Sequence, residues 1–200
     1  MYMNKGNSGE ASISNKVFRT DILLVLFLIV GIVLGAVASL KIGSEALAGI
    51  YSSDIYTDFD SWMETFLNYF AGSAVFVTAA FLMGFGAVSH PFEIMLVCFK
   101  GLGLGVLVSS IYSCDDILIR MALFLPFAVL SSGILIMQSC ESVAMSQRYF
   151  SLSLTNENRL GLANEFRDYI LKFLIYLVSC GVLSALNCLV LRLFDLMGWI

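Results

Sequence analysis

The fold is decided by residues 81–110, which read FLMGFGAVSHPFEIMLVCFKGLGLGVLVSS. Two long apolar runs meet in this stretch at the corner Ser89-His90-Pro91. A corner of this length leaves room only for a tight turn, and Pro91 suits the first turn of a helix, where its missing N–H is not needed. The stretch therefore predicts two antiparallel helices joined at this corner.

Two charged residues lie in the second apolar run. Glu93 stands at the start of the run, and Lys100 follows two helical turns later. Residues with this spacing share a helix face but lie roughly 10 Å apart along the axis, so we expect no direct salt bridge between them. We expect Glu93 at the membrane interface. Lys100 lies deep enough in the run that it must snorkel, meet a helix C-terminus or bridging water, or face a polar cavity.

Glycines surround the lysine and the corner. Gly101, Gly103 and Gly105 follow the lysine, and Gly84 and Gly86 close the first run. The missing side chains after the lysine favour either close helix packing or a local unwinding in which freed carbonyls accept the ammonium. The lysine is therefore either a packing and orientation device or part of a transport or partner-binding site.

Composition places the chain in a membrane. Hydrophobic residues make up 59% and charged residues 13% of its 200 residues, and the mean hydropathy is +0.89, which excludes an ordinary soluble domain. A bilayer core of roughly 30 Å requires about 20 apolar residues per helix, and uncharged runs of that length recur without the alternation of barrel strands. The sequence predicts an all-α polytopic membrane protein with five transmembrane helices. The spans are expected at about 22–40, 65–88, 92–113, 117–140 and 173–191.

Polar segments flank these spans, which together form a single transmembrane domain over residues 21–200. Residues 1–20 are polar and predict a disordered cytoplasmic N-terminus. The loop 41–62 is rich in aromatic residues, which favours a segment at the membrane surface. Its acidic residues belong either to a solvated loop or to a site for a cation or a basic partner. Asn164 is expected to cap a helix that begins at Glu165 and lies along the interface before it enters the fifth span.

Features inside the spans predict how the helices pack. Gly31 and Gly35 give the first span a GxxxG spacing, which lets two helix backbones approach closely. Pro126 in the fourth span predicts a kink, because its ring removes one backbone hydrogen bond. The five cysteines fall in or beside the apolar runs without close pairing, so we interpret them as packing residues.

The distribution of basic residues predicts the orientation. With the N-terminus inside, the cytoplasmic segments hold Lys5, Lys16, Arg19, Arg148, Arg159 and Arg167, with Lys172 at the edge, and the outer segments hold Lys41, Arg120 and Arg192. This excess favours an N-in, C-out topology by the positive-inside rule. We expect a multi-pass protein of the cell membrane.

The sequence lacks the residues on which several classes of function depend. The net charge of −4 and the absence of a basic block argue against a nucleic-acid partner. With no CxxC and a single histidine, we expect no metal and no cofactor. Walker, HExxH and GxSxG motifs are absent, so we expect no enzyme. An intramembrane enzyme would have to use His90 and Glu93 as an acid/base couple.

The features around the corner resemble the stage II sporulation protein M family of small polytopic membrane proteins. The matching features are FLMGFGAV with its two glycines, the short turn to Pro91, the helix centre FKGLGLG, and Leu125-Pro126 in the fourth span. Length, the five-helix count and the long first loop agree as well. After Pro126 this chain has Phe-Ala-Val where the family often has a polar or acidic residue, which leaves Lys100 as its only deep charge.

The resemblance implies a role in engulfment during endospore formation. It implies a non-catalytic scaffold in the septal or mother-cell membrane, assembled with the sporulation proteins D and P, which cut septal peptidoglycan. The loop 41–62 and the glycine faces would then contact single-span partners, and a homo-oligomer is compatible with this role. The alternative is a channel or transporter subunit in which Lys100 lines a polar pathway. The candidate assembly or polar site comprises Gly84, Gly86, Pro91, Glu93, Lys100, Gly101, Gly103, Gly105 and Pro126.

Overall fold

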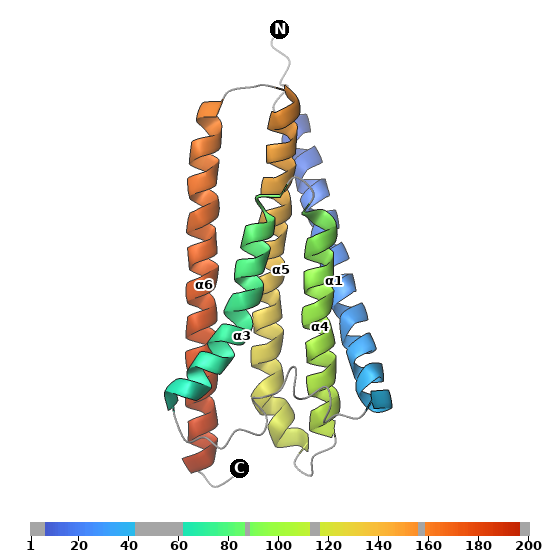
Figure 1. Cartoon of the computed structure of the whole chain (residues 1–200), viewed down its shortest axis with the longest axis vertical. Helices are drawn as coiled ribbons and strands as arrows, with labels where there is room; N and C mark the ends of the chain where they lie inside the picture. The colour runs from blue at the N-terminus through green and yellow to red at the C-terminus, as the bar shows by residue number, and fades with distance from the viewer. Residues whose placement is uncertain (1–6, 43–61, 87–88, 113–116, 156–158, 197–200) are drawn as a thin grey trace.

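The computed structural model describes residues 7–42, 62–86, 89–112, 117–155 and 159–196 (Figure 1). The described residues form long α-helices. The helices are α1 (Asn7–Ile42), α3 (Trp62–Met83), α4 (His90–Tyr112), α5 (Ile117–Thr155) and α6 (Arg159–Leu196).

Helix α5 is the central element of the bundle, because it contacts each of the other four helices. On one side of it, α1 packs against α4 in the most extensive interface between any two helices. On the other side, α3 and α6 pack against α5 and against each other (Figure 1). The two chain termini lie at opposite ends of the bundle (Figure 1).

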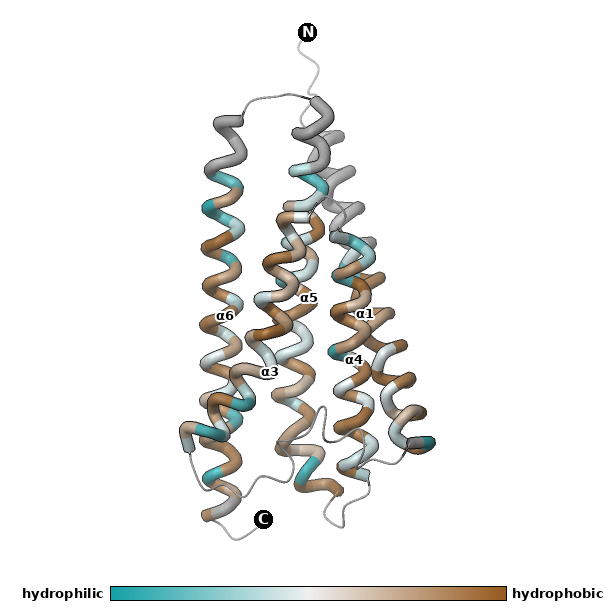
Figure 2. The backbone as a smooth tube through the Cα atoms, viewed as in Figure 1, coloured by the Kyte–Doolittle hydropathy of each residue, from teal (hydrophilic) through white to brown (hydrophobic). Residues whose placement is uncertain are grey.

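Each of the five helices contains a segment long and apolar enough to cross a membrane. These segments are Thr20–Lys41, Trp62–Met83, His90–Tyr112, Ile117–Tyr149 and Asn164–Phe194. Large apolar side chains such as those of Ile29, Val75 and Ile175 are exposed on the outer surface. Figure 2 shows hydrophobic residues along the middle of the helices and more hydrophilic ones toward their ends. The predicted all-α polytopic membrane fold with five spans is confirmed.

The corner between the second and third spans differs in detail from the prediction. The expected span 65–88 ends at Met83, and a turn over residues 84–86 follows, with hydrogen bonds from Gly84 N to Phe81 O (3.2 Å) and from Gly86 N to Met83 O (2.9 Å). Glycine loses more conformational freedom in a helix than other residues, so two of them favour an early end. Pro91 lies in the first turn of α4, as predicted.

The two helices joined by this corner run in opposite directions but diverge. They share the smallest of the helix–helix interfaces, because α3 leans toward α6 while α4 stands beside α1 (Figure 1). The tight corner therefore connects two sides of the bundle across α5.

The prediction of a separate interfacial helix start at Glu165, before the fifth span, is wrong. Helix α5 continues through the polar region to Thr155, and α6 begins at Arg159 and runs without interruption into its span, so Glu165 does not begin a helix. Once a helix has formed, each added residue extends it at little further cost. Salt bridges between Arg148 and Glu165 (2.9 Å) and between Glu141 and Lys172 (2.7 Å) join the two extensions.

The N-terminal segment also differs from the prediction. Helix α1 begins at Asn7, so most of the residues expected to be disordered belong to the helix that leads into the first span. The same low cost of extension from an existing helix accounts for this difference. Helix α5 remains helical across Pro126, and the predicted kink stays a prediction. Most of the loop 41–62 lies outside the described residues, as do Cys114, Asp115, Asp116 and Trp199.

Candidate functional site

Lys100 is directed into the bundle. Its ammonium lies 5.0 Å from the centre of the Phe76 ring on α3, and its charge also acts on the thiol of Cys180 on α6. A cation over an aromatic face gains about 0.5–1 kcal/mol when exposed and about 2 kcal/mol when desolvated. The half-buried lysine is therefore accommodated by an aromatic ring among the helices.

Gly101 and Gly105 form the contact between α4 and α1. A Cβ atom at Gly101 would overlap the carbonyl oxygen of Leu28, and one at Gly105 would overlap that of Ile32. The contact is reciprocal, because Gly31 and Gly35 of α1 have no room for a Cβ against backbone carbonyls of α4. The close-packing interpretation is confirmed, and α4 is helical throughout.

The contact between α1 and α4 contradicts the hypothesis that Gly101 and Gly105 form a docking face for a partner. Because α1 of the same chain covers Gly101 and Gly105, neither is available to a partner helix. Gly103 is half-buried. Close backbone approach of this kind is the usual function of small residues between membrane helices.

Glu93 is fully buried among the helices, at 0% exposure. The sequence predicted only its depth along the span, at the membrane interface; the structure adds that the protein itself surrounds the side chain. Ser142 on α5 donates a hydrogen bond to Glu93 Oε1 (2.5 Å), and Ser139, one turn earlier, faces the same carboxylate. The Glu93 backbone N–H donates to Ser89 O (2.9 Å), which closes the first turn of α4.

Tyr169 brings α6 into the same region. Its hydroxyl donates to Phe81 O (2.9 Å) and accepts from Gln138 Nε2 (3.5 Å). Its ring stacks on the Phe81 ring, with centroids 4.9 Å apart, and is buried. The hydroxyl therefore links α3, α5 and α6 at the point where α3 ends.

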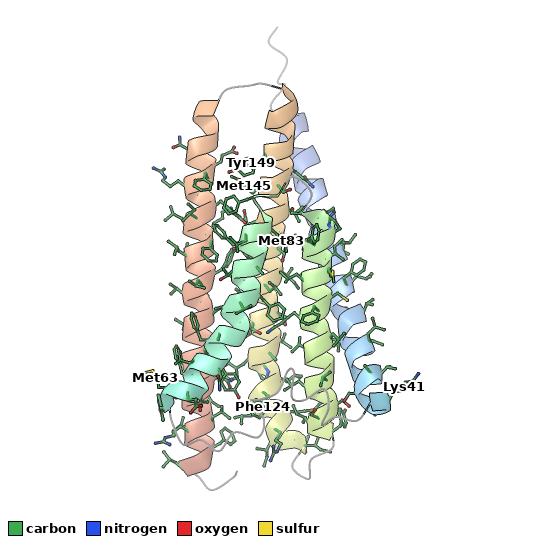
Figure 3. All side chains as sticks on the ribbon, viewed as in Figure 1. Lys41, Met63, Met83, Phe124, Met145 and Tyr149 are labelled. Atoms are coloured by element: carbon green, nitrogen blue, oxygen red, sulfur yellow. The ribbon has the colours of Figure 1, made fainter. Side chains whose placement is uncertain are left out.

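Gly84 leaves room for the Tyr169 hydroxyl in this region, and Gly86 provides a backbone carbonyl that accepts a hydrogen bond. A Cβ at Gly84 would overlap the Tyr169 hydroxyl and lie 3.1 Å from Ser142 Oγ. Gly86 O accepts a hydrogen bond from Ser146 Oγ (2.6 Å). We define the polar cluster as Ser89, Glu93, Gln138, Ser139, Ser142, Ser146 and Tyr169, all of them buried. Met83, next to Gly84, and Met145, next to Ser146, mark its level in Figure 3.

Sequence reasoning identified Glu93 and the two glycines but missed the partners on α5 and α6. A signal for them was present, because Gln138, Ser142 and Ser146 recur every fourth residue and therefore lie on one helix face. Tyr169 gave no comparable signal, since a tyrosine near a span end is also typical of a membrane interface.

The structure does not bring His90 and Glu93 together as an acid/base couple. His90 is exposed, whereas Glu93 is buried and bonded to Ser142. Pro126 is exposed and far along the chain from the residues that contact Glu93. Cys180 and Cys188 are buried as packing residues, while Cys140 donates to Asp21 Oδ1 (2.7 Å) and so links α5 to α1.

Among the residues that the structure describes, no group of three or more His, Cys, Asp or Glu side chains could hold a metal ion. Comparison of the chain with protein-family models, with curated proteins and with solved structures gave no match.

Proposed function

We propose that this chain is a non-catalytic scaffold of the cell membrane that holds membrane-anchored wall hydrolases resembling the stage II sporulation proteins D and P. In this proposal it supports septal wall thinning during engulfment, and the hydrolases cut the peptidoglycan. The resemblance around residues 81–126 motivates the pathway.

The observation that carries the proposal is the contrast between two kinds of glycine. Gly31, Gly35, Gly101 and Gly105 join helices of the chain itself. Gly72 on α3 and Gly133 on α5 are exposed, and a Cβ at either position would meet no other atom within 4 Å. Small residues on a lipid-facing surface permit close approach of another helix, which is what a single-span partner would supply.

The placement of charged residues supports an N-in, C-out orientation for the scaffold. Arg148, Arg167 and Lys172 lie on the α5–α6 extensions. Tyr149, next to Arg148, and Lys41 lie toward opposite ends of the bundle (Figure 3). Under the positive-inside rule the extensions are cytoplasmic. The loop 41–62, most of which lies outside the described residues, is then on the side of the cell wall.

Crosslinking in sporulating cells tests the proposal. A photoreactive phenylalanine analogue replaces Val75, which is exposed and one turn from Gly72, and the same analogue at the exposed Leu26 of α1 serves as the control. We expect adducts with the wall hydrolases from position 75 and not from position 26. Gly72→Leu should abolish these adducts without destabilising the protein, because a Cβ at this position meets no other atom within 4 Å.

The scaffold proposal fails if neither Val75 nor a matching position beside Gly133 captures a hydrolase in cells where the protein restores wall thinning. It also fails if Gly72→Leu leaves both the adducts and wall thinning unchanged.

A channel or transporter subunit is the second candidate. It is favoured by one observation: Lys100 and Glu93 lie on the same face of α4, and both point among the helices. In this case Lys100→Met abolishes flux in proteoliposomes and leaves assembly intact. The scaffold proposal instead expects Lys100→Met to weaken assembly or to have no effect, and no flux in the wild type.

A further inference from the structure

The polar cluster has more hydrogen-bond acceptors than donors. The Ser142 hydroxyl donates to Glu93, the Tyr169 hydroxyl to Phe81 O, and the Gln138 amide to Tyr169. Within the described part of the chain, four buried oxygens of the cluster have no hydrogen-bond partner: Ser89 Oγ, Glu93 Oε2, Gln138 Oε1 and Ser139 Oγ. The carboxylate and amide oxygens can only accept, whereas the two serine hydroxyls can also donate, so a ligand held by the lone pairs of all four oxygens must carry positive charge or a proton.

These oxygens belong to residues that meet around one carboxylate. Ser139 and Ser142 both face Glu93 from α5, and Ser89 is joined to Glu93 through the backbone at the start of α4. Gln138 bonds to Tyr169, whose hydroxyl lies beside Ser142 over Gly84. Three helices and the end of α3 therefore enclose the site.

An unpaired charge at Glu93 is costly in this position. Its side chain is 0% exposed, and the effective penalty for burying a carboxylate is several kcal/mol. Buried acids remove this penalty by taking up a proton or by pairing with a cation. Within the described part of the chain, Ser142 donates a hydrogen bond to Glu93, and Ser139 faces the same carboxylate.

The surrounding charges favour a positive ligand. The titratable or charged groups near the site include Asp21 of α1, His90 and Lys100 of α4, Cys140 and Glu141 of α5, and Tyr169, Lys172 and Tyr176 of α6. The end of α3 and the turn after it contribute the backbone carbonyls of Phe81 and Gly86. Counting Glu93, three carboxylates face two ammonium groups, and one ammonium is bound to Glu141.

We propose that Glu93, Gln138, Ser139 and Ser89 form a buried site for one small positive charge, either an alkali-metal ion such as Na⁺ or a proton on Glu93. Carboxylate, amide and hydroxyl oxygens are ligands for hard cations. A proton would instead reside on Oε2 and be donated to one of the unpartnered oxygens. The site is separate from the scaffold surfaces at Gly72 and Gly133 and does not depend on the proposed function.

Thermal unfolding of the purified full-length protein in detergent micelles tests the site. The melting temperature is measured in NaCl, KCl and choline chloride at equal ionic strength, and in choline chloride from alkaline to mildly acidic pH. If Na⁺ is the ligand, NaCl raises the melting temperature of the wild type saturably. Glu93→Gln removes this response, and Gln138→Leu raises the half-saturating concentration about tenfold or more.

If a proton is the ligand, Na⁺ has no specific effect and acidification stabilises the wild type. Glu93→Gln, which mimics the protonated acid, then removes this pH dependence. Glu141→Gln is the matched control, because it removes a carboxylate at the edge of the cluster and should keep the wild-type responses. Equal responses of the wild type and Glu93→Gln to both Na⁺ and pH overturn the proposal.

A second pair of variants keeps the test decisive if Glu93→Gln does not fold. Ser139→Ala and Gln138→Leu leave the carboxylate in place and remove one oxygen each. Each should shift the Na⁺ half-saturation or the midpoint of the pH response, and no shift in either variant overturns the proposal.

Discussion

A single methyl group added at Gly105 tests how α1 and α4 are held together. In Gly105→Ala the new Cβ would overlap Ile32 O and lie 2.7 Å from Ala36 N, whereas ordinary contact begins at 3.4 Å. At the nitrogen alone, α1 must move away by about 0.7 Å. Since both atoms belong to the backbone of α1, the helix has to move as a unit.

The expected loss of stability follows from this displacement. A gap of about 0.5–1 Å forfeits a quarter to a half of the dispersion energy of each contact. Overpacking in well-packed cores costs about 1–3 kcal/mol, and the upper value applies where the obstacle is backbone. Replacing glycine by alanine within a helix stabilises the helix by about 1 kcal/mol, which offsets part of this cost. We expect the free energy of unfolding to fall by about 2 kcal/mol.

Reversible unfolding in mixed micelles with increasing SDS, followed by circular dichroism, measures this change. Gly72→Ala and Gly133→Ala are matched controls, because nothing lies within 4 Å of a Cβ at either position. They should be neutral or stabilising by up to about 1 kcal/mol. If Gly105→Ala costs no more than Gly72→Ala, backbone contact does not hold α1 against α4.

A double substitution sharpens the test. A Cβ at Gly31 would lie 3.1 Å from the Cα of Gly101, and the reverse distance is 3.2 Å, so both substitutions push the same helices apart. The loss of unfolding free energy in the double variant Gly31→Ala/Gly101→Ala should be smaller than the sum of the losses in the two single variants, because contacting residues are coupled. Additive losses would indicate that the two glycines act at separate contacts.

Three further predictions concern the polar cluster and its edge. Tyr169→Phe keeps the stacking on Phe81 but leaves Gln138 without its hydrogen-bond partner. The free energy of unfolding in SDS should therefore fall by about 1–3 kcal/mol. No change would show that the hydroxyl makes no stabilising hydrogen bond. Gly84→Ala should destabilise the protein through the Tyr169 hydroxyl, and adding Tyr169→Phe should relieve part of that loss, whereas strict additivity would contradict the contact. Lys172→Met removes a partly exposed salt bridge to Glu141 and should change the unfolding free energy by less than about 1 kcal/mol, so a larger loss would mean that the pair is shielded from water.

The five spans were predictable because the bilayer sets a length that uncharged apolar runs must meet. The polar extensions of α5 and α6 were not predictable in this way, because the length rule describes only the apolar part of a helix that crosses the bilayer. The two extensions pair with each other, through Arg148 with Glu165 and Glu141 with Lys172. Such pairing between distant segments leaves no local mark in the sequence. The same limit applies to the N-terminal part of α1.

For the candidate site, the sequence ranked the two charges of α4 by their depth along the span. That ranking made Lys100 the buried group and Glu93 the interfacial one. In the folded chain Lys100 is half-buried beside Phe76, while Glu93 is fully enclosed. Depth along a span and burial within the protein are separate quantities, since burial depends on which helices lie beside a residue. A single helix does not contain that information.

The early end of α3 explains why the enclosure forms at Glu93. The last carbonyls of a helix have no partner within it, and ending α3 at the glycine turn presents Phe81 O to Tyr169 and Gly86 O to Ser146. These bonds draw α5 and α6 to the corner and, with Ser142, cover the carboxylate of α4. A variant that extends α3 through Gly84 and Gly86 should therefore expose Glu93, and its carboxylate would then become accessible to water-soluble carbodiimides.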